Sequence, residues 1–120
     1  MTVENSNAIL FQSGMKKVEG TGNLTFEINS TSSENGKAFI RTFENTGDLV
    51  SFEGFDSLTF NGNQDNNVFT IIVDNGGIAF GSSEKSLQNL TFNKTVLDAW
   101  KSSFTADVYA QNLSMSETLC

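Results

Sequence analysis

Carboxylates are the side chains in this sequence best suited to acid–base chemistry. Glu53 and Asp56 flank one predicted turn, and Asp65 and Asp74 lie at opposite ends of a predicted strand. Hydrolysis of a glycosidic bond needs two carboxyl groups about 5–10 Å apart, one of them in an apolar pocket. An acid at a turn is usually a solvated residue, and a compact sheet of 120 residues has little room for a substrate cleft. We therefore interpret these acids as turn and surface residues.

Other catalytic and metal-binding groups are scarce. The chain contains no histidine, and its one cysteine is Cys120. This excludes Ser–His and Cys–His couples, histidine-containing or four-cysteine zinc sites, and a disulfide within the chain. The loop 61–67 offers several Asn side chains but only one acid, so we interpret it as a polar turn rather than a Ca²⁺ site. The sequence predicts a protein that is not an enzyme and has no metal or cofactor.

Aromatic residues surround one acidic turn. Phe52, Phe55 and Phe60 lie close to Glu53 and Asp56 in the sequence. An apolar patch rimmed by acids is typical of a protein-docking face. Alternatively, Phe52 and Phe60 point into the core and Phe55 covers one end of it. The sequence leaves these two alternatives open.

Period-two alternation predicts strands over most of the chain. Leu24, Phe26 and Ile28 alternate with polar residues, which is typical of a strand with one solvated face. Asn75–Gly76 favours a type I′ turn, so we expect residues 69–73 and 77–80 to form a hairpin. Further strands are expected at 37–43, 49–52, 58–60, 68–73, 87–92 and 104–109.

One segment follows a different period. Residues 95–101 begin with a partial capping box, and Val96, Leu97, Trp100 and Phe104 lie on one stripe at helical spacing. We predict a short helix near residues 95–103, with Trp100 covering one end of the sheet.

A short internal repeat is also present. Leu-Thr-Phe occurs at residues 24–26, 58–60 and 90–92, but the similarity does not extend far beyond each copy. We therefore favour an all-β fold, a single antiparallel β-sandwich or barrel of eight to nine short strands with one helix, over a three-fold repeat. Residues 1–120 are expected to form one domain, with ends 1–7 and 112–120 flexible or ordered only against a neighbour.

Charge restricts the choice of partners. The formal net charge is −7, from 14 acidic and 7 basic residues, so direct binding to nucleic acid is disfavoured. We see no secretory signal and no apolar run long enough to span a membrane, and we expect a reducing, cytoplasmic or virion-like setting.

These features predict a non-catalytic interaction module that docks on another protein with a basic surface, as inhibitors, immunity proteins and mimics do. The predicted binding residues are Glu53, Phe55 and Asp56, with Asp65 and Asp74 as steering charges. One alternative is a self-assembling subunit of a shell, tube or filament, whose partners are copies of itself. Another is a carbohydrate-binding module, with Trp100 and Tyr109 as its exposed rings.

Overall fold

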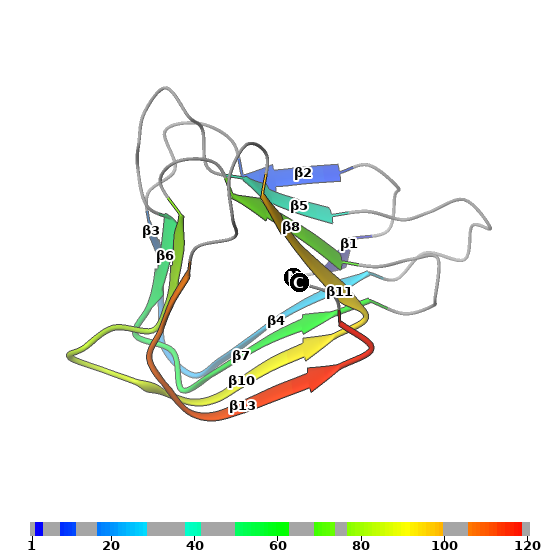
Figure 1. Cartoon of the computed structure of the whole chain (residues 1–120). Helices are drawn as coiled ribbons and strands as arrows, with labels where there is room; N and C mark the ends of the chain where they lie inside the picture. The colour runs from blue at the N-terminus through cyan, green and yellow to red at the C-terminus, as the bar shows by residue number, and fades with distance from the viewer. Residues whose placement is uncertain are drawn as a thin grey trace.

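In the computed structural model, the described residues form thirteen short strands wound into a three-sided parallel β-helix (Figure 1). It describes residues 2–3, 8–11, 17–28, 38–41, 50–62, 69–73, 77–99 and 106–118. The strands are β1 (Thr2–Val3), β2 (Ala8–Phe11), β3 (Lys17–Glu19), β4 (Asn23–Ile28), β5 (Ala38–Arg41), β6 (Val50–Glu53), β7 (Ser57–Asn61), β8 (Phe69–Val73), β9 (Ile78–Phe80), β10 (Leu87–Asn93), β11 (Thr95–Ala99), β12 (Ala106–Val108) and β13 (Ala110–Ser116).

Successive strands belong to successive sheets. The first sheet has the order β1-β4-β7-β10-β13, the second β11-β8-β5-β2 and the third β12-β9-β6-β3. Every pairing between the described strands is parallel. Three consecutive strands therefore make one coil of the β-helix, and each coil hydrogen-bonds to the next.

The antiparallel β-sandwich or barrel expected from the sequence is therefore wrong. The expected hairpin is also absent, because β8 pairs with β5 and β11 whereas β9 pairs with β6 and β12 in another sheet. The turn residues 74–76 that suggested the hairpin lie outside the described residues. Alternating sequences predict strands equally well in both architectures, since one face of each strand is buried in either case.

The helix predicted near residues 95–103 is a second error. Thr95–Ala99 forms β11, which pairs in parallel with β8, and Thr95 and Leu97 are buried while Val96 is half-buried. The Thr95 hydroxyl donates to the carbonyl oxygens of Phe60 (3.3 Å) and Asn93 (3.1 Å), so it binds the neighbouring coil instead of capping a helix. The pairing of this segment with β8 outweighs its weak local preference for a helix. Trp100 lies outside the described residues.

The repeated Leu-Thr-Phe motif marks equivalent positions of successive coils. In the first sheet, Leu24, Leu58, Leu90 and Leu113 are in register. The same register aligns Phe26, Phe60, Phe92 and Met115. The last strand, β13, covers Ala110–Ser116. The expectation of one domain whose ends 1–7 and 112–120 are flexible or ordered only against a neighbour stays a prediction.

Stacked phenylalanines fill the interior. Phe60 lies between Phe26 and Phe92, with ring centroids 5.1 and 5.4 Å apart and nearly parallel rings. Phe52 and Phe80 of the third sheet form a second stack at 5.8 Å and meet the first stack edge to face. All five rings are buried. Phenylalanine is abundant because each coil must supply rings to this interior.

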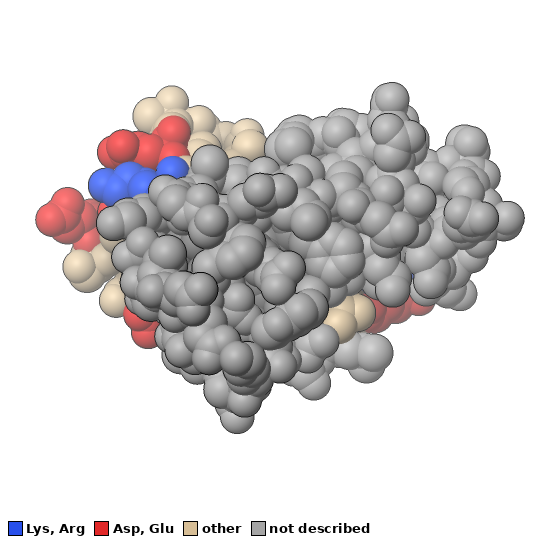
Figure 2. Space-filling view, turned by 90° about the horizontal axis from the view of Figure 1, so that it is seen from above, with Lys and Arg blue, Asp and Glu red and all other residues tan. Residues whose placement is uncertain are grey.

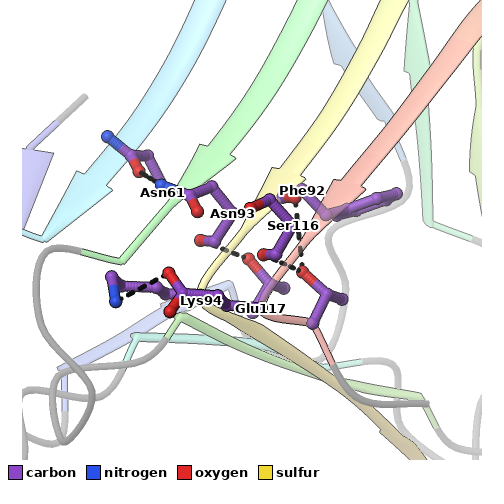
Figure 3. A network of polar contacts seen from close by, with 8 residues as sticks. Asn61, Phe92, Asn93, Lys94, Ser116 and Glu117 are labelled. Carbon is purple, nitrogen blue, oxygen red and sulfur yellow. Dashed lines mark hydrogen bonds and ion pairs between the residues drawn. The ribbon is translucent and has the colours of Figure 1, made fainter.

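Polar contacts join the coils at the corner after the first sheet (Figure 3). Asn93 donates its side-chain amide to the Asn61 oxygen one coil away (2.7 Å). Lys94 and Glu117 occupy equivalent turn positions with positive φ, and their side chains form an ion pair of 2.8 Å. The backbone N–H of Lys94 also donates to the Ser116 carbonyl (3.0 Å). Neighbouring coils are thus held in one register by side chains as well as backbone.

Candidate binding surface

The acidic turn singled out in the sequence lies at the corner between the third sheet and the first. Glu53 ends β6 and Asp56 precedes β7, so this turn leads from one sheet into the next. Gly54 has a φ of 94°, and a Cβ on it would lie 2.3 Å from the Gly20 carbonyl oxygen. Only glycine can hold both the left-handed backbone and this close contact.

Backbone hydrogen bonds stack this corner on its neighbours. The Gly20 N–H donates to the Glu53 carbonyl (3.2 Å), and the Asp56 N–H donates to Gly22 (2.7 Å). The Gln88 N–H donates to the Asp56 carbonyl (2.6 Å), which ties in the next coil. The corner is therefore part of the rigid backbone ladder rather than a loose loop.

Phe55 does not lie on the surface. It is only 6% exposed and belongs to the buried cluster, and its ring would contact a Cβ placed on Gly20 at 2.9 Å. Phe52 and Phe60 are fully buried. The structure thus matches the second alternative, in which these rings fill the core, and the acid-rimmed aromatic patch is not present. Phe55 can affect binding only by supporting the turn that carries Glu53 and Asp56.

Five acids cluster on the third sheet and the turns that follow it, and we call this group the acidic corner: Glu19, Glu53, Asp56, Glu84 and Asp107. Two lysines lie among them. The Lys17 ammonium is 3.4 Å from the Glu53 carboxylate, and the Lys85 ammonium is 3.0 Å from that of Asp56. Figure 2 shows acidic and basic side chains together at one end of the molecule. Asp65 and Asp74 lie outside the described residues.

The charges of the acidic corner do not cancel. Glu19 and Glu53 are direct register partners on neighbouring coils, and like charges in that position repel. Glu19, Glu84 and Asp107 are exposed and form no ion pair with any described residue. Among the described residues, three carboxylates are therefore left without a lysine, which gives the corner a negative potential.

A hollow of about 230 Å³ opens on the outer face of the third sheet, beside Glu53. Ser51, Ala79 and Asp107 form one register row across β6, β9 and β12. Glu53, Gly81 and Tyr109 also line the hollow, one from each of the same three coils. The middle coil supplies Ala79, Gly81, Ser82 and Ser83, and the two smallest of these, Ala79 and Gly81, form the floor of the hollow.

The remaining polar groups of the hollow come from the turn after β9. Ser82 and Ser83 complete its lining. The Ser82 hydroxyl accepts from the Lys85 N–H (3.1 Å), and Ser51 donates its hydroxyl to Glu53 (3.0 Å). Within the described part of the chain, no three potential metal-binding side chains lie close enough to hold one ion.

Sequence analysis found Glu53 and Asp56 but missed Asp107, Ser51 and Ala79 as parts of one surface. A usable signal was present, since Phe52, Phe80 and Val108 are equally spaced in the sequence and occupy equivalent register positions of the three coils. Aligning the chain on them would have placed Asp107 beside Ala79 and Ser51.

The comparisons with known proteins assign no family. No family model matches the chain, and neither a curated protein nor a solved structure matches it significantly. No helix among the described residues is long and apolar enough to cross a membrane.

Proposed function

We propose that the protein is a non-catalytic interaction module that docks its acidic corner on a basic surface of another protein. The observation that carries this proposal is that, among the described residues, one corner of the β-helix holds five carboxylates against two lysines. A concentrated negative potential raises the rate of encounter with a basic surface and disfavours acidic partners.

Rigidity adds to the electrostatic argument. The turn that carries Glu53 and Asp56 and the strand that carries Asp107 are bonded to neighbouring coils through their backbones. A surface that is already ordered loses less conformational entropy when a partner binds. The three acids without lysine partners, Glu19, Glu84 and Asp107, are the groups that a partner's cations would meet first.

A matched pair of variants tests the proposal. Glu19→Gln with Glu84→Gln removes two charges from the acidic corner, and Glu27→Gln with Glu117→Gln removes two charges elsewhere. Glu27 lies near the end of β4 and Glu117 directly follows β13, about 16 and 20 Å along the strands from the corner. The probe is a fluorescent oligolysine peptide, with affinity measured by anisotropy at low and at physiological ionic strength.

We expect the corner variant to bind the peptide about five-fold more weakly, because two exposed ion pairs contribute about 0.4–2 kcal/mol together. The control variant should change affinity less than two-fold, and salt should weaken binding of the native protein. Equal losses in the two variants would show that only net charge matters, and binding independent of salt would remove the electrostatic basis of the proposal.

A second function, assembly with copies of itself, is favoured by a separate observation. β13 pairs with β10 on one side, and no described strand pairs with its other side. Leu113 (52% exposed) and Met115 (45% exposed) occupy positions whose equivalents Leu90 and Phe92 are buried. An open strand edge with exposed apolar residues is suited to adding the strand of another molecule.

Sedimentation velocity at increasing concentration tests assembly. If copies associate through β13, Leu113→Lys with Met115→Lys should shift the chain to a monomer, because charges at an edge oppose strand addition. Gln111→Lys with Asn112→Lys, which adds the same charge without removing apolar surface, should reduce association less. A native chain that stays monomeric at every concentration would contradict this second candidate.

A further inference from the structure

The hollow beside Glu53 forms on the third sheet because small residues on one coil lie between larger residues on the two neighbouring coils. Its walls come from two coils that are separated by a third, so they stand about 10 Å apart, twice the spacing of neighbouring strands. Ser51 and Glu53 form one wall, and Asp107 and Tyr109 form the other. Its volume of about 230 Å³ is below the range of about 300–1,000 Å³ that holds drug-sized ligands. One small ring-shaped molecule therefore fits its size.

The floor of the hollow is set by the backbone. Gly81 has a φ of 82°, and a Cβ on it would lie 2.5 Å from the Tyr109 carbonyl oxygen. Its N–H donates to the Phe52 carbonyl (2.8 Å), and the Tyr109 N–H donates to the Phe80 carbonyl (2.9 Å). These contacts keep a side chain off the floor and hold both walls in place, so the hollow exists before a ligand arrives.

The lining is rich in hydrogen-bond acceptors and contains an aromatic ring. Both walls carry a carboxylate, and each can accept hydrogen bonds from two neighbouring hydroxyl groups. Asp107 is exposed and forms no ion pair with a described residue, so its oxygens are open to a ligand. Tyr109 is 37% exposed and offers a ring edge or face together with its own hydroxyl. Ligands that match are compact, with several donors and an apolar C–H face.

Charge distinguishes between the classes of ligand. Two carboxylates in the lining disfavour an anion. A cation is less favoured than a neutral ligand, because Lys17 already lies 3.4 Å from Glu53 and supplies positive charge to that wall. A metal ion is also disfavoured, because no three potential metal-binding side chains among the described residues lie close enough to hold one.

We propose that the hollow binds one neutral sugar ring, such as a hexose unit at the end of a glycan. The ring would lie on Ala79 and Gly81, its hydroxyls would donate to Asp107 and Glu53, and Tyr109 would cover its C–H face. Glu53 and Asp107 belong both to the acidic corner and to the lining, whereas Glu19 and Glu84, whose variants test the docking of a basic protein, lie outside the lining.

The test is an NMR titration of the labelled protein with methyl glycosides of glucose, galactose and mannose. We expect at least one glycoside to bind with a dissociation constant near the millimolar range, as suits a ligand of this size. The amide signals of Gly81, Ser82 and Asp107 should shift the most. Binding should be the same at low and physiological salt, whereas oligolysine binding should fall, so the two proposals can fail independently.

The variants change the two exposed residues of one wall of the hollow, Asp107 and Tyr109. Asp107→Asn and Tyr109→Ala should each weaken glycoside binding at least ten-fold, and Glu27→Gln, which lies outside the hollow, should leave it unchanged. Both wall residues are exposed, so the variants should keep the native amide spectrum elsewhere. Arginine methyl ester is titrated in parallel as a cationic probe. The proposal is overturned if no glycoside shifts these signals, if only the cationic probe does so, or if the wall variants bind glycosides as well as the native protein.

Discussion

Phe60 has the most interior position among the stacked rings. It is fully buried, lies between Phe26 and Phe92, and contacts Phe52 and Phe80 edge to face. Its ring therefore joins three coils and two sheets. If the Phe60 ring were removed, its aromatic neighbours could not move in to fill the cavity, because each of them is held in place by its own strand.

We predict that Phe60→Ala lowers the free energy of unfolding by about 3–5 kcal/mol, because it removes a buried ring and leaves a cavity. Met115→Ala, at an equivalent position of β13 that is 45% exposed, should cost less than about half as much. Equilibrium urea unfolding followed by circular dichroism measures both. Similar losses in the two variants would mean that Phe60 is not buried in a stack.

The corners of the β-helix depend on glycine to different degrees. Gly22 and Gly54 both have positive φ, but a Cβ on Gly22 would meet nothing within 4 Å, whereas one on Gly54 would overlap the Gly20 carbonyl. The two positions therefore separate the cost of backbone conformation from the cost of a clash between coils.

We predict that Gly22→Ala destabilises the fold by about 1–2 kcal/mol, the cost of a left-handed conformation for an L-residue. Gly54→Ala should cost clearly more, because the turn must also move away from Gly20 and disturb the Gly20–Glu53 backbone bond. Thermal unfolding of both variants checks the order. Equal shifts in melting temperature would indicate that the coils do not approach closely at this corner.

Strand positions could be predicted from the sequence because alternation is local. Segments such as 24–28, 58–60 and 87–92 needed only their own residues, and all lie in strands. The way the strands pair could not be predicted in this manner, since it depends on residues a whole coil away. Thr95 shows the difference: its local pattern favours a helix start, but its hydroxyl bonds the Phe60 carbonyl on the preceding coil.

The residues of the candidate site likewise fall into two groups: those predicted from the local sequence and those that depend on the register between coils. Glu53 and Asp56 were predicted together because they flank one turn, and that turn carries both on the acidic corner. Asp107 reaches the same surface only through the register of β12 with β9 and of β9 with β6. Phe55 could not be assigned from the sequence, because its burial depends on the close approach of Gly20 from another coil.

The β-helix repeats one arrangement along its axis, in which each strand residue is the register partner of the equivalent residue on the next coil. Thr25, Thr59 and Thr91 show this on the outer face of the first sheet, where β4, β7 and β10 are in register. In an antiparallel sandwich the same three residues would have different neighbours. The spacing of these threonines therefore reports directly on the architecture of the chain.

We predict that cysteines at Thr59 and Thr91, introduced with Cys120→Ser, form a disulfide under mild oxidation. Register partners on neighbouring parallel strands lie about 4.8 Å apart, within the range of about 4.4–6.8 Å between the Cα atoms of a disulfide. Cysteines at Thr25 and Thr91 provide the control, because they are two coils and about 10 Å apart and should stay reduced. Mobility on non-reducing gels and free-thiol titration distinguish the two. Cross-linking of the control pair, or none in the 59–91 pair, would rule out the parallel stacking of these coils.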